Sequence, residues 1–466
     1  MKLRRATSVM IAALFVGVIA APQSSAAIKS GAACKKPGLE SIQSGRKFTC
    51  IKQGKKFVWN KGVVIKAAPA ANPSPSATPS PSPSATPSPS PSATPSPSPS
   101  ATPTPAPTRP QLSFIQMLRS PMIDGKFPIE YETYSIPTKL PTSWQDLLEN
   151  REGIAYKAWL SMSKTVATAS SSLGKVSVSV GPNTELPYKD LQNAMQLVSK
   201  GFPSAKQPGT VSVIAFNFTD QMWANDLYRN LIASEPDSFK RNYQDSVIDT
   251  CQAARKICWS AMGFTNPAGD GIVLLGVVES EKLMNLDSSF SNYARSNLGL
   301  TVAHEYFHTI QRKLIDKNWF QQIYTPPSWF HEATAVYVEN SAMNHASFDK
   351  YMRFRAVDSK LAYPSCGSAS EGCISVTEEI MTSFLSLSHY STNWNNFPYG
   401  MKYEVSLRTI EVLVALKGHQ SITDLYSYME QNHTFEEAFL KIYGITYSSA
   451  IPVLAKIVSE QFANNR

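Results

Sequence analysis

Residues 304–308 read HEYFH, two histidines four positions apart with a glutamate beside the first. On a helix, positions i and i+4 share one face a single turn apart, so His304 and His308 can bind the same metal ion. Glu305 is placed to hold and deprotonate a water molecule rather than to bind metal. The flanking residues 298–303 and 309–311 are uncharged and mostly apolar, which predicts a buried helix. Burying these polar groups without a metal would be costly, so we expect a metal site rather than a core helix with hydrogen-bonded histidines.

The third metal ligand is expected from a second helix. Residues 328–337 read SWFHEATAVY and follow two prolines, which suit a first helical turn. A catalytic zinc ion takes three protein ligands and keeps a fourth position open for water, and Glu332 is the natural third ligand. The neighbouring His331 points about 100° away around the helix. It could therefore replace Glu332 only if the phase of this helix is misread.

Together, the two segments resemble the gluzincins, metallopeptidases whose pattern is HExxH followed by W-x-x-E-G-x-A-x-Y. Trp329, Glu332, Ala335 and Tyr337 fall on this pattern, and Ala333 stands at the usual glycine. Because alanine is nearly as small as glycine, this departure should not disturb metal ligation.

The resemblance extends over roughly residues 301–462. It implies a zinc-dependent hydrolase of peptide bonds in which a metal-activated water attacks the substrate. The Zn²⁺ ion would be held by His304, His308 and Glu332, and Glu305 would be the catalytic base.

A tyrosine further along the chain is the expected second catalytic residue. Gluzincins of the aminopeptidase-like and minigluzincin type follow the ligand helix with Y-x-x-(G/S), an apolar helix and a glycine, and Tyr403 with residues 407–418 fits this spacing. The resemblance implies that Tyr403 donates a hydrogen bond to the oxyanion of the tetrahedral intermediate. Tyr399, His389 and His419 are the alternative donors, and Tyr403 is then a packing residue. Each of the two histidines is otherwise expected at the surface.

The sequence departs from true aminopeptidases upstream of the HEYFH segment. It lacks the G-x-M-E-N segment that captures the free amine of a substrate. Instead, a glycine-bounded apolar run at residues 272–278 predicts a strand, and in zincins such a strand pairs with extended substrate. We therefore expect an endopeptidase or a narrowly specific hydrolase. The alternative from another class is a catalytically degenerate zincin that acts as a cell-surface binding or adhesion protein, against which the intact Glu305 argues.

The N-terminus and the cysteines indicate export. Residues 1–26 combine basic residues, an apolar run too short to span a bilayer and a small-residue end, as a secretory signal does. No later segment reaches spanning length, so we expect a secreted protein, extracellular or cell-wall associated. Six cysteines agree with an oxidising compartment, and pairing between sequence neighbours is the simplest arrangement. The expected pairs are Cys34–Cys50, Cys251–Cys258 and Cys366–Cys373.

Composition divides the chain after the signal into three parts. Residues 27–66 carry ten basic residues and one acid, a net charge of +9, and predict a small cysteine-paired module of two or three strands. It resembles short basic modules of bacterial secreted proteins. Residues 67–110 form a Pro/Ser/Thr/Ala-rich linker that favours extended polyproline II. The remaining residues 111–466 carry 30 basic and 34 acidic residues, so the basicity belongs to the module. Its expected partner is an anionic cell-surface polymer rather than nucleic acid, and a solvated surface without a partner is the alternative.

Residues 111–466 predict an α+β, zincin-like catalytic domain. Its sheet is expected to lie over the active-site helix, and a mainly helical C-terminal subdomain to hold Glu332 and Tyr403. Periodicity predicts helices at 188–198 and 221–232 and a further strand at 210–218. The least legible part lies within residues 111–200, for which an accessory subdomain and a propeptide are both open. The expected partner of the whole region is a peptide or protein substrate.

Overall fold

The computed structural model separates the chain into two compact units, Met1–Thr104 and Pro105–Arg466. The predicted signal, the linker and the pair Cys366–Cys373 lie outside the residues that the structure describes. The described residues are 31–33, 40–43, 46–54, 56–61, 63–64, 126–278, 293, 295, 297–316, 324–357, 362–363, 374–387 and 396–463.

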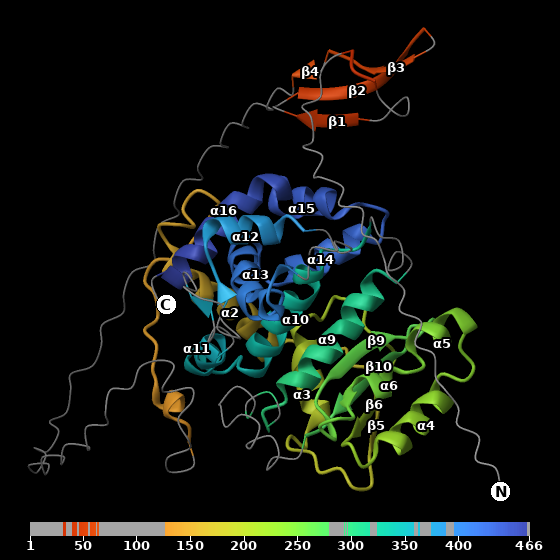
Figure 1. Ribbon diagram of the computed structural model, residues 1–466. Helices are drawn as coiled ribbons and strands as arrows, with labels where there is room; N and C mark the ends of the chain where they lie inside the picture. The colour runs from red at the N-terminus through yellow and green to blue at the C-terminus, as the bar shows by residue number, and fades with distance from the viewer. Residues whose placement is uncertain are drawn as a thin grey trace, which may run out of the picture. The chain divides into compact units, whose positions relative to one another are not determined.

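The N-terminal unit contains a small antiparallel sheet (Figure 1). Its four strands outnumber the two or three predicted, and β2 pairs with β1, β3 and β4. Gly54 adopts the left-handed conformation, with φ of 62°, in the turn from β2 to β3. Cys50 is buried and disulfide-bonded, whereas its expected partner Cys34 lies outside the described residues. The strands are β1 (Glu40–Gln43), β2 (Arg46–Gln53), β3 (Lys56–Trp59) and β4 (Val63–Val64).

A four-stranded mixed sheet forms the first half of the larger unit. Its order is β5-β6-β10-β9, in which β6 pairs in parallel with β5 and β10, and β9 pairs antiparallel with β10. The strands predicted at 210–218 and 272–278 are confirmed as β6 and β10. The bounds are β5 (Lys175–Val180), β6 (Thr210–Phe216), β9 (Ala261–Thr265) and β10 (Gly271–Gly276).

The two inner strands are mostly apolar because both of their faces are covered. Val213 and Val273 belong to a large apolar cluster on one face, and their neighbours Ile214 and Leu274 to a smaller cluster on the other. Helices α3 (Leu191–Gly201) and α9 (Leu300–Leu314) cover the first face. Helices α4 (Gln221–Leu231), α5 (Asp237–Tyr243) and α6 (Ser246–Asp249) cover the second (Figure 1). Helix α3 starts three residues later than predicted, and α4 occupies its predicted place.

The strand that was predicted to pair with substrate is not an edge strand of this sheet. The predicted substrate-pairing strand, β10, is bonded along its whole length to β6 on one side and to β9 on the other. Among the described strands, β9 pairs only with β10. Beside β10 it is therefore β9 that forms this edge of the sheet.

The second half of the larger unit is mainly helical, as predicted. Helix α2, which the sequence did not predict, lies within the same apolar cluster as α9 and α10, so residues 154–168 share their core. Among the described residues, no single helix is long and apolar enough to cross a membrane; α15 and α16 meet that requirement only as a pair bent by 70°. The helices are α2 (Ile154–Thr168), α10 (Ser328–Met343), α11 (Phe348–Val357), α12 (Glu378–Leu385), α13 (Glu404–Lys417), α14 (Gln420–Met429), α15 (Phe435–Tyr443) and α16 (Tyr447–Ala463).

Strand β9 packs directly against α9 through a glycine. A Cβ atom added at Gly263 would collide with the backbone carbonyl of Glu305. Only glycine allows the edge strand and the helix to approach this closely.

We expect Gly263→Ala to lower the free energy of unfolding by at least about 2 kcal/mol, because the collision is with backbone that cannot step aside. Gly209→Ala is the matched control, since nothing lies within 4 Å of a Cβ added there; we expect it to change stability by less than about 1 kcal/mol. Urea unfolding followed by circular dichroism measures both. Equal stability of the two variants would contradict the close approach.

Candidate metal centre

Two helices bring together three side chains that could hold a metal ion. His304 and His308 lie one turn apart on α9, and Glu332 lies in the second turn of α10. One potential ligand atom of each lies within 4.8 Å of the others. The Glu332 carboxylate oxygen Oε2 is 3.5 Å from Nε2 of His304 and 3.4 Å from Nε2 of His308. The predicted ligand residues are thus adjacent in space, and His331 is not a member of the group.

The spacing of these atoms suits a small tetrahedral ion. Two ligand atoms that each lie about 2.1 Å from a tetrahedral zinc ion are about 3.4 Å apart. The two separations from Glu332 match this value. Two imidazoles and one carboxylate also supply three ligands and leave a fourth position for water or substrate. The donor set therefore fits a divalent ion of this kind.

A second side chain places an oxygen close to the other ring nitrogen, Nδ1, of each imidazole. Nδ1 of His304 lies 2.9 Å from Oε2 of Glu339, whose side chain is completely buried. Oε1 of Glu339 lies 3.1 Å from the guanidinium of Arg295. The Glu339 carboxylate lies beside Nδ1 of His304, and Nε2 on the other side of the ring faces Glu332.

The group that orients His308 is an uncharged amide. Its Nδ1 lies 2.6 Å from Oε1 of Gln311, one turn further along α9. The amide nitrogen of Gln311 donates to the backbone oxygen of His331 and the hydroxyls of Thr334 and Tyr426. These acceptors fix which end of the amide faces His308, so Nε2 of this histidine also points toward Glu332.

The electrostatic surroundings favour a positive charge between the two helices. In the metal-free protein, burial lowers the pKa of His304, but the carboxylates of Glu339 and Glu332 outweigh it and raise this pKa to about 10. Burial raises the pKa of Glu305. Burial acts in the same sense on Glu332, yet His308 and His304 hold the pKa of Glu332 well below its usual value. A divalent cation can supply the positive charge that these acids attract.

A cavity of about 460 Å³ opens onto the group. Glu305 and Tyr403 line it together with the three potential ligands, and the ring centroid of Tyr403 lies 6.4 Å from that of His304. Residues 259–263, which include the start of β9, form another wall. The cavity therefore places an extended strand edge, a carboxylate and a phenol around the potential metal position.

The three alternative donors fall into two groups: two lie wholly or partly outside the described residues, and the third lies away from the cavity. The side chain of Tyr399 and all of His389 are outside the described residues. His419 was expected at the surface, which is wrong: it is 3 % exposed. Its imidazole lies 2.8 Å from the Ser161 hydroxyl and 2.7 Å from the Gly201 carbonyl, and burial lowers its pKa to about 4. This histidine joins three helices instead of lining the cavity.

His331 lines the cavity without belonging to the ligand group. Its ring stacks on that of His308 at a centroid distance of 4.5 Å, and its Nδ1 lies 3.2 Å from the Tyr426 hydroxyl. The phase of α10 therefore directs Glu332, rather than His331, toward the two imidazole Nε2 atoms.

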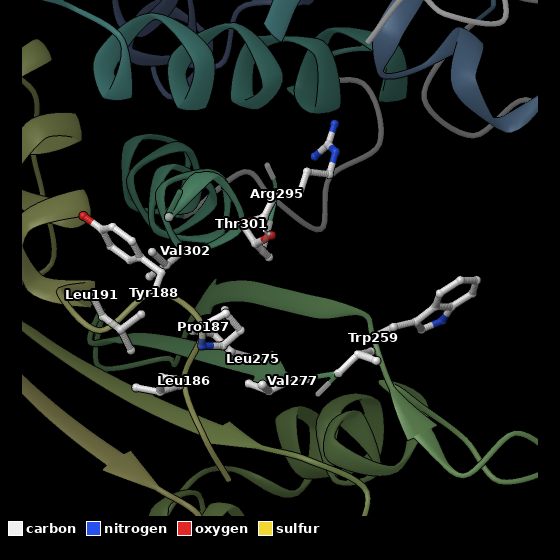
Figure 2. A pocket seen from close by; sticks show the side chains of 13 residues that line it. Leu186, Pro187, Tyr188, Leu191, Trp259, Leu275, Val277, Arg295, Thr301 and Val302 are labelled. Atoms are coloured by element: carbon white, nitrogen blue, oxygen red, sulfur yellow. Dashed lines mark hydrogen bonds between the residues drawn. The ribbon is translucent and has the colours of Figure 1, made fainter. Parts of the chain in front are cut away.

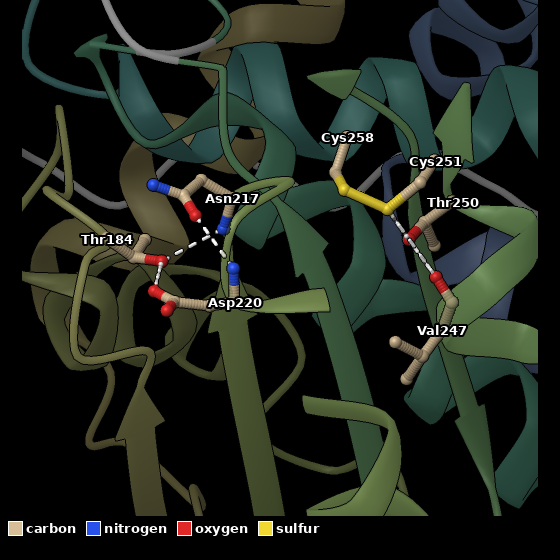
Figure 3. Close-up of a disulfide and its surroundings, with 7 residues drawn as sticks. All are labelled: Thr184, Asn217, Asp220, Val247, Thr250, Cys251 and Cys258. Carbon is tan, nitrogen blue, oxygen red and sulfur yellow. Dashed lines mark hydrogen bonds between the residues drawn. A yellow bond between two sulfur atoms is a disulfide. The ribbon is translucent and has the colours of Figure 1, made fainter. Parts of the chain in front are cut away.

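A disulfide-bonded hairpin reaches the rim of the cavity. The predicted pair Cys251–Cys258 is confirmed and joins β7 (Cys251–Gln252) to β8 (Ile257–Cys258), where the two cysteines are direct cross-strand partners (Figure 3). The Thr250 hydroxyl beside it donates to the backbone oxygen of Val247. Trp259 follows the hairpin at once, lines the cavity and is 52 % exposed.

Sequence reasoning missed Glu339, Arg295 and Gln311, although a signal for two of them existed. Glu339 lies seven residues after Glu332, and Gln311 lies seven residues after His304, which places each on the same helix face as a ligand. Comparison of the chain with protein-family models, curated proteins and solved structures finds no match. What the site can do is therefore argued from its geometry.

We expect Glu339→Gln to weaken Zn²⁺ binding by about 10- to 100-fold, because the charge that orients His304 is lost. Glu411→Gln is the matched control: Glu411 is equally buried and paired with an arginine, Arg355, at 2.6 Å, but is not part of this centre. Competition with a chromophoric chelator measures the dissociation constants. Equal loss of affinity in both variants would show a general effect on stability and contradict a positioning role.

Proposed function

We propose that this chain is a secreted zinc-dependent peptidase of the gluzincin type and acts as an endopeptidase. The observation that carries the proposal is the placement of His304, His308 and Glu332 around one position, with Glu305 on the wall of the same cavity. This combination has the ligands, the open position and the base that hydrolysis of a peptide bond requires.

Zinc, when bound, supplies a Lewis acid for the scissile carbonyl and lowers the pKa of a water molecule toward neutrality. Glu305 accepts the proton of that water and delivers it to the amine that leaves. Its buried position supports this role, because burial raises the pKa of a carboxyl group toward the range of a general base at neutral pH. Buried Glu339 lies against the imidazole of His304 and buried Gln311 against that of His308, and each keeps its imidazole in one orientation during the reaction.

Tyr403 is assigned to the oxyanion that develops on the scissile carbonyl. Its position at the start of α13, on the cavity wall and close to His304, supports the assignment. A hydroxyl there can donate a hydrogen bond to the developing negative charge while Glu305 handles the proton.

The edge strand supports an endopeptidase. Residues 260–263 line the cavity, and β9 pairs only with β10 among the described strands. An extended peptide can add to such an edge through its backbone, with substrate residues on both sides of the scissile bond. The rival assignment, a degenerate zincin that serves as an adhesin, gives no role to Glu305 in the cavity. The basic residues 27–66 are assigned to an anionic cell-surface polymer on their net charge of +9.

We expect Glu305→Gln to retain zinc and lose turnover, because the amide keeps the shape and removes the base. Glu332→Ala should lose both zinc affinity and turnover, because two histidines alone remain as protein ligands. Elemental analysis and a chelator-sensitive assay on a peptide library measure these outcomes. His331→Ala is the control and should keep its zinc. Full zinc retention in Glu332→Ala, with loss in His331→Ala, would overturn the ligand assignment.

We expect Tyr403→Phe to lower kcat by about 10²- to 10³-fold, as loss of one oxyanion donor does, with zinc content unchanged. Single-turnover hydrolysis of a good library substrate isolates this step. Tyr399→Phe is the matched control, since the two tyrosines stand one turn apart in the sequence. If only Tyr399→Phe slows the reaction, the donor is Tyr399 and the assignment of Tyr403 is wrong.

A further inference from the structure

A second, smaller pocket of about 150 Å³ lies beside the metal cavity (Figure 2). It is bordered by the first turn of α9, the carboxyl end of β10 and the loop that leads into α3. Most of its lining is apolar, and Figure 2 shows Leu186, Pro187, Leu191, Leu275 and Val277 gathered around it.

The two cavities share part of their walls. Trp259, Arg295 and Thr301 line both of them. Thr301 precedes the ligand His304 by three residues on α9, which is about 4.5 Å along a helix axis. The pocket therefore begins within one helical turn of the potential metal position, the distance at which the side chain of a residue flanking the scissile bond would lie.

The polar groups of the pocket are directed to other partners. The hydroxyl of Tyr188 accepts a hydrogen bond from Asn193 and points away from the apolar side chains in Figure 2. The guanidinium of Arg295 is paired with Glu339 at 3.1 Å. A charged substrate side chain would lose its hydration here without a dedicated partner, whereas an apolar side chain loses nothing.

The pocket walls are held in place from several sides. The loop before α3 is fastened by buried Asp220, which accepts hydrogen bonds from the backbone and side chain of Asn183 and from the Thr184 hydroxyl (Figure 3). Gly299, with φ of 76°, lies so close to the Tyr188 ring that an added Cβ would stand 2.6 Å from it. A pocket built this way exists before substrate arrives and selects by size.

We propose that this pocket is a specificity subsite for one apolar side chain, of leucine, methionine or phenylalanine size, next to the scissile bond. The proposal rests on the peptidase function given above. An apolar cavity of about 150 Å³ accommodates a benzene-sized group, so phenylalanine fits, tryptophan exceeds the space and alanine leaves it largely empty. The substrate class is thus peptides with a medium-sized apolar residue next to the cleaved bond.

The test compares kcat/KM over a peptide library that varies Ala, Leu, Phe, Trp, Asp and Lys at each position around the cleaved bond. The wild-type protein should prefer Leu or Phe over Ala, Asp and Lys by at least about tenfold at one position. Val277→Phe fills the pocket and should reduce the preference for the Phe over the Ala peptide, measured as the ratio of their kcat/KM values, at least about tenfold. Val178→Phe is the matched control, since Val178 is 44 % exposed on β5 and does not line the pocket.

A second variant covers the case in which Val277→Phe does not fold. Leu186→Ala alters a half-buried loop residue and enlarges the pocket, so the ratio of Trp to Phe cleavage should rise at least about fivefold. Unchanged selectivity in Leu186→Ala, or a wild-type protein that cleaves without apolar preference, would overturn the subsite and leave the peptidase assignment intact. Absence of cleavage of every peptide by the zinc-loaded wild-type protein would instead overturn the proposed function.

Discussion

The burial of charge between α9 and α10 is the constraint around which this molecule is organised. Glu305, Glu339 and His304 are each less than a tenth exposed. Isolated charges in such surroundings are costly, so each must meet an opposite charge or a hydrogen-bond partner. The ion pair from Arg295 to Glu339 and the contact from Glu339 to His304 form one chain that ends at the potential metal position. These two contacts give the buried carboxylate of Glu339 a positively charged partner, Arg295, and so allow α9 and α10 to pack around it.

The four-stranded sheet also helps to position the residues of α9. Its inner strands β6 and β10 are packed against apolar clusters on both faces, so they form a rigid layer between two sets of helices. The edge strand β9 then rests on α9 at Gly263, where no side chain intervenes. Rigid strands and helices, rather than flexible loops, therefore set the distance from the strand edge to Glu305.

Sequence reasoning succeeded where the chemistry is local and weakened where tertiary packing decides. The i, i+4 spacing of His304 and His308 follows from helix geometry alone. Glu339 was not foreseen because it lies on the other helix and reaches Nδ1 of His304 only when α9 and α10 are docked, whereas Gln311 lies three residues after His308 on the same helix and was overlooked. The edge role of β9 was missed for a similar reason: Ala261–Thr265 is short and contains a glycine, and sheet order depends on pairings that no single strand encodes. The alternating KVSVSV of β5 was a visible strand signal left unused.

The hairpin closed by Cys251 and Cys258 has a chemical consequence for how the protein matures. It carries Trp259, on the wall common to both cavities, whereas the three potential metal ligands contain no sulfur. A thiol reductant would therefore open the hairpin at the edge of the cavity and leave the three potential ligands unchanged. Occupation of the ligand group and oxidation of the two thiols would therefore be separate steps, because the two groups share no residue.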